Sequence, residues 1–318
     1  MLTPSATAAL CRAALLPLTG VLVGALVACG GADKAADDGP CATAATTDAS
    51  ARPIPLAPPA VELISSGTAP HQALRAAPDR TAAHRARITS TTTVLTRLAD
   101  TGGDDSISRE DQSVTAEITE RRNCTDDTDV ALRFDALSAT DPRLSADLAK
   151  DNGSRGGLTL GDSGAPVSLR LWPRDGAPTT ARAIVENTVA TALQNIVALP
   201  SEPVGTGASW RITRTLLGAT TLHQTVTATL RRRAGDLIDL DISVDETPTG
   251  AEYTVPGTGK TLRIARYTAL GHGTARFDLR RALPIGGSID VHGARELVGD
   301  DATRPLVQQT RYQLQWSR

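Results

Sequence analysis

The stretch of sequence that decides the fold is residues 237–245, which read Leu-Ile-Asp-Leu-Asp-Ile-Ser-Val-Asp. Aliphatic side chains occupy every second position from Ile238 to Val244, and the positions between them are acidic or carry a hydroxyl group. Successive side chains of a β-strand point to opposite faces. This spacing therefore predicts a strand with one dry face and one wet face, as is typical of an antiparallel sheet.

The same alternation recurs along the chain and predicts about ten to thirteen strands. Further runs occupy residues 114–118, 130–136, 222–230, 275–279 and 312–316. Glycine-rich stretches separate such runs, and we interpret residues 102–105, 234–236 and 271–273 as turns. Strands that follow one another through short turns indicate an antiparallel meander.

One segment departs from this pattern. Between residues 179 and 199 the apolar positions follow the i, i+3, i+4 spacing of a helix, with Pro178 before it and Pro200 after it. A shorter helical turn is predicted to begin at Asp141 and Pro142. We therefore expect a mainly β (α+β) fold. It would be a strongly curved antiparallel sheet or half-barrel, with one main helix at about residues 179–199 on its concave face.

The N-terminus has the features of an export signal. Arg12 precedes an apolar run of about 15 residues, which is short for a membrane span of about 20 residues. The run ends in Leu-Val-Ala-Cys at residues 26–29, which resembles the lipobox of bacterial lipoproteins. The resemblance implies that residues 1–28 are a signal peptide and that Cys29 is lipidated. The alternative is an ordinary secretory signal followed by an unrelated cysteine.

The composition after Cys29 predicts the domain organisation. Residues 29–59 are rich in Gly, Ala, Asp, Thr and Pro, so we expect a lipidated flexible tether. Residues 60–318 would form a single β-rich domain. The chain would be anchored in the bacterial cell envelope, outside the cytoplasm. Because Gly30 follows the lipidated cysteine in place of Asp, the outer membrane is expected if two membranes are present.

Two cysteines remain once the signal peptide and the lipid are accounted for. Cys11 leaves with the signal peptide, and Cys29 is committed to the lipid. Cys41 and Cys124 are then a pair in an oxidising compartment, which favours a disulfide between them. Two free buried thiols, or a bond between chains, are the alternatives.

The stretch at residues 199–210 reads Leu-Pro-Ser-Glu-Pro-Val-Gly-Thr-Gly-Ala-Ser-Trp. It resembles the signature of an uncharacterised bacterial lipoprotein family, and residues 61–75 and 273–284 are also similar to that family. The resemblance implies no activity, because none is assigned to the family. From the residues themselves, Gly205 and Gly207 permit a tight turn and Trp210 supplies a large core side chain. A loop that contacts a ligand is the alternative interpretation.

Two strings resemble the motifs of trypsin-like proteases. Residues 81–84 end in His84, and residues 161–166 read Gly-Asp-Ser-Gly-Ala-Pro around Ser163. In that chemistry the histidine takes the proton of the serine. However, polar residues precede His84, and about 150 residues follow Ser163. We therefore interpret residues 161–164 as a turn and predict no catalytic residue, with a serine hydrolase kept as an alternative.

Residues 256–261 resemble the end of a phosphate-binding loop, but position 254 is Thr where the motif needs Gly. The residues after Lys260 also alternate like a strand, so a hairpin turn is expected and no cofactor is predicted. The five histidines have no metal-ligand spacing, and the aspartates at 239, 241 and 245 are expected to be a solvated face. No metal site is therefore predicted.

The formal net charge of −2 gives no basic field for nucleic acid. The function that we expect is a non-enzymatic envelope lipoprotein, possessing a half-barrel groove for a lipid or another apolar ligand. This architecture resembles that of lipid-carrier lipoproteins with an incomplete barrel, which is an analogy of fold only. The alternative is an interaction module that binds another envelope protein. The expected partners are the membrane, through the N-terminal lipid, and either a lipid ligand or an envelope protein.

Overall fold

The computed structural model describes residues 39–43, 51–98, 107–255 and 257–318. The predicted signal peptide at residues 1–28 and the predicted lipidation site Cys29 lie outside the described residues. In the described part of the chain, no helix is long and apolar enough to cross a membrane.

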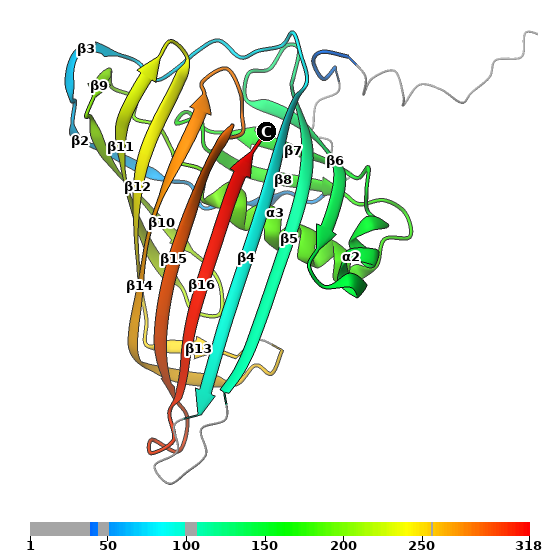
Figure 1. Cartoon of the computed structure of the whole chain (residues 1–318), viewed down its shortest axis with the longest axis vertical. Coiled ribbons are helices and arrows are strands. Elements are labelled where there is room, and N and C mark those ends of the chain that lie inside the picture. The colour runs from blue at the N-terminus through cyan, green and yellow to red at the C-terminus, as the bar shows by residue number, and fades with distance from the viewer. Residues whose placement is uncertain (1–38, 44–50, 99–106, 256) are drawn as a thin grey trace, which may run out of the picture.

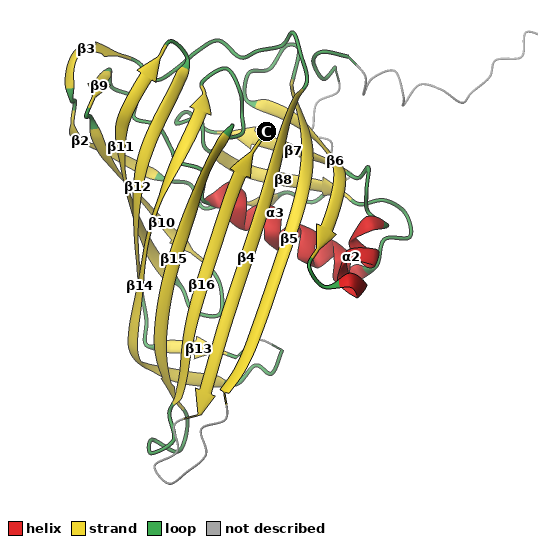
Figure 2. Ribbon diagram, in the orientation of Figure 1, coloured by secondary structure: helices red, strands yellow, loops and turns green. Residues whose placement is uncertain are grey.

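The fold is mainly β, as Figure 2 shows, and the described residues place fourteen strands in one large sheet. In spatial order its main path runs through β1 (Ile54–Pro55), β8 (Pro166–Trp172), β7 (Arg155–Leu160), β6 (Asp129–Ala139), β5 (Ile107–Arg122), β4 (His84–Leu98), β16 (Leu306–Ser317), β15 (Gly286–Val298), β14 (Thr261–Asp278), β12 (Leu237–Pro248), β11 (Leu222–Ala234), β10 (Ser209–Leu216) and β2 (Ala60–Ser65). The short β13 (Glu252–Thr254) pairs with β14 off this path. A second, small sheet pairs β3 (Thr68–Gln72) with β9 (Val204–Thr206).

The predicted antiparallel β fold is confirmed. In β12, Ile238, Leu240, Ile242 and Val244 are each at most 4 % exposed. All strand pairs of the large sheet are antiparallel. The described strands outnumber the ten to thirteen that were expected. Short strands such as β1, β3 and β9 are too brief to show alternation in the sequence.

The prediction of a turn at residues 271–273 is wrong, because these residues lie inside β14. A Cβ atom on Gly273 would stand 2.1 Å from the carbonyl oxygen of Ser288. A Cβ atom on Gly271 would stand 2.7 Å from a methyl carbon of Val291. Glycine is therefore required here by the close approach of β15, and not by a reversal of the chain.

Two helices are present in the described residues, and both were predicted. The main helix, α3 (Thr179–Gln194), begins where expected but ends before residue 199. The shorter α2 (Pro142–Ala149) begins at Asp141, whose side chain accepts a hydrogen bond from the Leu144 N–H at 2.7 Å. Residues 195–200 follow α3 as a non-helical segment.

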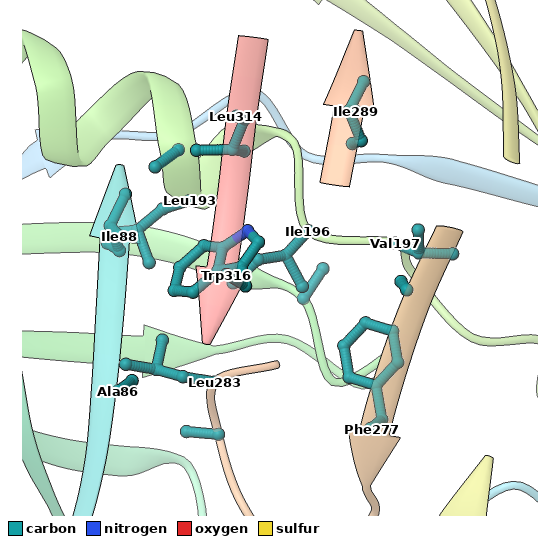
Figure 3. Close-up of a cluster of buried hydrophobic side chains, with 14 of the residues drawn as sticks. Ala86, Ile88, Leu193, Ile196, Val197, Phe277, Leu283, Ile289, Leu314 and Trp316 are labelled. Atoms are coloured by element: carbon teal, nitrogen blue, oxygen red, sulfur yellow. The ribbon is translucent and has the colours of Figure 1, made fainter. Parts of the chain in front are cut away.

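The core lies between α3 and the aliphatic face of the sheet. In Figure 1, α3 is drawn behind β4 and β5, and it contacts β4 and β8. Figure 3 shows Leu193, in the last turn of this helix, and Ile196, just after it, beside Ile88 of β4 and Trp316 of β16. Trp210 of β10 is fully buried and donates its indole N–H to the carbonyl of Ala198 at 2.8 Å. This bond fixes the segment after α3 against the sheet.

The predicted tether, residues 29–59, extends too far towards the C-terminus. Ile54 and Pro55 form β1, which pairs with β8, and Leu56 is only 2 % exposed. Residues near Cys41 are also attached, because the Ala42 N–H donates to the Arg122 carbonyl at 2.9 Å. The composition of residues 29–59 resembles that of a loop. Its described residues are nevertheless attached to the domain, because Leu56 is buried and the backbone forms hydrogen bonds with neighbouring strands.

The predicted disulfide between Cys41 and Cys124 is confirmed, with their Cα atoms 5.2 Å apart. It joins the segment before β1 to the end of β5. The bond closes a loop between residues 83 positions apart.

One edge of the sheet is incomplete. Residues 107–113 of β5 pair with β4, whereas β6 meets β5 only from Val114 onward. Within the described residues, no strand pairs with the other side of this half of β5. The stretch is exposed and carries Arg109, Glu110 and Asp111, and Arg109 is bound to Asp111 at 2.5 Å.

We predict that replacing both Cys41 and Cys124 by Ser lowers the free energy of unfolding by about 4 kcal/mol, because the open chain gains loop entropy in the unfolded state. Urea denaturation followed by tryptophan fluorescence measures this difference. The same loss should follow when the unchanged protein is unfolded under reducing conditions. A loss below about 1 kcal/mol in both experiments would contradict the stabilising role of the bond.

Candidate functional site

A cavity of about 310 Å³ lies where β5 and β14 end. Its other walls come from residues 74–78, the turn at residues 161–164, the segment after α3 and the loop after β14. Much of the wall is apolar and includes Leu74, Leu160, Ile196, Val197, Leu199 and Phe277. Ile196 and Val197 stand in this wall because the Trp210 bond holds the segment that contains them.

Arg122 and Arg281 line this cavity together with Arg75, which is exposed. Arg122, at the end of β5, is 8 % exposed, and one of its Nη atoms donates to the carbonyl of Asp127 at 2.9 Å. Burial lowers its pKa, against the attraction of Glu120 and Asp127. Arg281, in the loop after β14, has its Nε 3.5 Å from Asp278, too far for a good hydrogen bond. In the described structure, the buried Nε atoms of both arginines have no hydrogen-bond acceptor.

Asp278 is the carboxylate beside Arg281, and its side chain is 3 % exposed. Its main partner is Arg280, which donates from Nε at 3.0 Å and from Nη at 2.9 Å. Burial opposes ionisation, yet the hydrogen bonds from Arg280 hold the pKa of Asp278 below its usual value. Arg280 reaches this carboxylate without lining the cavity.

Glu120 lies behind Arg122, within the protein, and is 4 % exposed. Its carboxyl group accepts the backbone N–H of Leu283 at 3.0 Å, so it holds the loop after β14. Burial raises the pKa of Glu120 to about 7, although the guanidinium groups of Arg122 and Arg281 act in the opposite direction. Glu120 therefore exchanges its proton near neutral pH.

His84 and Ser163 do not form the arrangement of a serine protease. The His84 Nε2 atom lies 3.0 Å from an oxygen of Asp79, and burial lowers the pKa of His84. Ser163 lines the cavity, and its carbonyl accepts the N–H of Leu199 at 3.0 Å. No hydrogen bond joins His84 to Ser163 in the described structure. Residues 161–164 form the predicted turn, which the Gly164 N–H closes on Gly161 at 2.9 Å.

Other sequence candidates have structural roles. The described residues of the string at 256–261 form the turn between β13 and β14, as predicted. Two of the three aspartates of β12 are in ion pairs, since Asp239 binds Arg276 at 2.5 Å and Asp241 binds Arg231 at 2.8 Å. The described part of the chain holds no group of side chains with the composition of a metal site.

The motif at residues 199–210 also has a structural explanation. A Cβ atom on Gly205 would stand 1.7 Å from the carbonyl oxygen of Thr68, where β9 crosses β3. Gly207 has a φ angle of +81°, which favours glycine. Leu199 and Pro200 at the start of the motif line the cavity. The motif therefore combines a close backbone crossing with one wall of the site.

Sequence analysis missed Glu120, Arg122, Asp278 and Arg281. Glu120 and Arg122 come after the alternating apolar residues of β5, and Asp278 and Arg281 come after those of β14. Charged residues at such positions usually indicate only that a strand is ending. Only the fold brings the two strand ends together. The signal that could have been noticed is a charged run, Glu-Arg-Arg at residues 120–122, two positions after the core residue Ile118.

Comparisons with known proteins identify no family. No family model matches the chain, and no curated protein matches it. Among solved structures, one titled "Lipid-protein interactions in lipovitellin" is similar at 12 % identity and a TM-score of 0.40. The match covers 72 % of this chain and 24 % of that chain, so this chain spans about a quarter of its length. A likeness at this level supports no inference about ligand or activity.

We predict that Glu120→Gln changes how stability depends on pH. Between pH 4.5 and about 7 the folded protein keeps a proton that the unfolded chain releases. The contribution of Glu120 to the free energy of unfolding therefore falls as pH rises through this window, by roughly 2–3 kcal/mol. Glutamine does not titrate and still offers an oxygen to Leu283, so the variant should lack this fall.

Urea denaturation of the two proteins at pH 5 and pH 8 checks this expectation. Glu117→Gln is the matched control, because Glu117 is an exposed carboxyl group on the same strand. Equal pH dependence in the unchanged protein and in Glu120→Gln would show that Glu120 titrates normally.

Proposed function

We propose that this chain is an exported lipoprotein of the bacterial envelope that binds a small lipid or another apolar ligand. The observation that carries the proposal is the partly open cavity of about 310 Å³ at the ends of β5 and β14, whose wall is more apolar than polar. Binding sites for small molecules are typically concave and mostly apolar, with a few polar groups that fix orientation. The cavity has these properties.

The proposal includes a half-barrel that curves around α3. Two observations support this shape. Glycines in β14 and β15 allow close approach of the strands, as at Gly273, and such glycines permit a sheet to bend sharply. Strands distant in the sheet order, β8 and β10, also contribute Leu169 and Trp210 to one hydrophobic cluster. Because α3 packs on the aliphatic face, we place the ligand at the strand ends and not along the groove.

The proposed anchor would be joined to the domain near the cavity. Cys29 would carry the lipid after removal of residues 1–28, which leaves twelve positions to Cys41. A flexible segment of that length spans about 20 Å on average. Cys41 is bonded to Cys124, and the neighbouring Ala42 is hydrogen-bonded to Arg122 of the cavity wall. The cavity would therefore face the membrane at short range, in the outer membrane if two are present.

In this proposal the chain belongs to the uncharacterised lipoprotein family that its motif resembles, and it has no catalytic residue. Ser163 is a wall residue of the cavity. Its carbonyl oxygen accepts a hydrogen bond from the Leu199 N–H, and in this proposal that bond fixes the turn.

We predict that Ser163→Trp removes a bound ligand, because the indole ring would occupy the cavity, whereas Ser163→Ala retains it. Native mass spectrometry of the full-length chain carrying Cys29→Ala, purified from an exporting host without detergent, measures the bound mass. A small adduct that leaves on denaturation is expected for the parent and for Ser163→Ala. A parent protein without any adduct, which also takes up no lipid added in solution, would overturn the ligand-binding proposal.

We also predict that Cys29→Ala abolishes metabolic labelling with a fatty acid and releases the protein from the membrane fraction. The thiol of Cys29 is the acyl acceptor in this proposal, so no other residue can replace it. Cys11→Ala is the matched control and should leave labelling unchanged. Full labelling of the Cys29→Ala protein would show that the anchor has been misassigned.

A further inference from the structure

We propose that the ligand of this cavity is an anionic amphiphile with a single short chain, whose head group is bound by Arg122 and Arg281. This inference rests on the proposed function, since it names the chemical class of the ligand for the same cavity. The arginines lie at the ends of β5 and β14, and the apolar wall continues beside them through Ile196, Leu199 and Phe277. An acyl chain would pack on this wall while its charged end meets the guanidinium groups.

The hydrogen-bonding capacity of the two arginines favours an anion. Arg122 is more than nine-tenths buried, and its Nε has no acceptor in the described structure. The Nε of Arg281 also has no acceptor in the described structure, because the nearby Asp278 oxygen is 3.5 Å away and does not have hydrogen-bond geometry. Buried donors are normally satisfied by a partner. Both arginines line the cavity, so a carboxylate or phosphate group bound there would meet their guanidinium groups and could form charge-assisted hydrogen bonds with them.

The acidic residues of the cavity do not saturate these arginines. Asp278 accepts two hydrogen bonds from Arg280, one from Nε and one from Nη, and Asp127 is bound by Arg80. Each carboxylate thus has an arginine partner outside the cavity lining. Arg75 and Asp162, which also line the cavity, are both exposed at its rim. The remaining acidic group is Glu120, whose raised pKa leaves it partly neutral near pH 7.

The volume of the cavity limits the size of the ligand. A cavity of about 150 Å³ takes one benzene ring, so twice that volume has room for about twelve carbon atoms. The observed 310 Å³ therefore fits one chain of about ten carbons with its head group. A lipid with two or three long chains would not fit inside.

The test compares sodium decanoate with 1-decanol, which have the same chain and differ in the charge of the head group. Isothermal titration calorimetry near neutral pH uses the full-length chain carrying Cys29→Ala, so that no detergent competes. Decanoate should bind about tenfold to a hundredfold more tightly than decanol, as expected for hydrogen bonds to a charged group. This comparison needs no change in the cavity.

A pair of variants then assigns the preference to the cavity. Arg281→Gln should remove most of the preference for decanoate and leave decanol binding unchanged. Asp278 keeps Arg280 in this variant, so the loop should remain folded. Arg266→Gln is the matched control: it removes one positive charge from β14 at an exposed residue that does not line the cavity, and the preference should persist. Arg281→Lys should restore part of it.

The outcomes separate the two proposals. Equal affinity for decanoate and decanol would overturn the anionic head group and leave the ligand-binding function standing. Binding of neither compound, together with no adduct in the native spectrum, would overturn the proposed function itself. An equal loss of preference in Arg266→Gln and Arg281→Gln would attribute it to the general charge of the protein and would also overturn the assignment to Arg281.

Discussion

The structure depends on one constraint, which is that the aliphatic face of a very wide sheet must be kept from water. The chain has only 3 % aromatic residues, so few of its side chains are large enough to do this alone. The helix α3 and residues 195–200 supply the missing cover, and the bond from Trp210 to Ala198 fixes their position. Burial of apolar surface, and not hydrogen bonding along the strands, therefore decides where this segment lies.

The helix α3 and the segment after it also determine where the buried charged residues lie, which is at one end of the sheet. Because α3 ends at Gln194, the chain continues along the core towards the ends of β5 and β14, where Ile196 belongs both to the core and to the cavity wall. Buried charges gather at this boundary because the apolar core stops there. Glu120 lies within it and ties the loop after β14 to β5, so the geometry of the arginines depends on a carboxyl group that the cavity itself does not expose.

Much of the fold could be predicted from local patterns, whereas the site could not. Alternation identifies β12, helical spacing identifies α3, and cysteine pairing identifies the disulfide, since each signal lies in neighbouring residues or in a count. Gly273 was misread because glycine has the same appearance in a turn and at a close strand crossing. Glu120 and Leu283 are 163 positions apart, and nothing in their local sequence indicates that they meet.

The incomplete edge of β5 has a consequence for the behaviour of this protein in concentrated solution. Residues 107–112 form an edge to which a strand of another molecule could add, which is a common route to aggregation. Arg109, Glu110 and Asp111 are exposed on this edge, and charged side chains on an edge strand oppose such addition. Replacing them by apolar residues would therefore lower the solubility of the protein more than the stability of its fold.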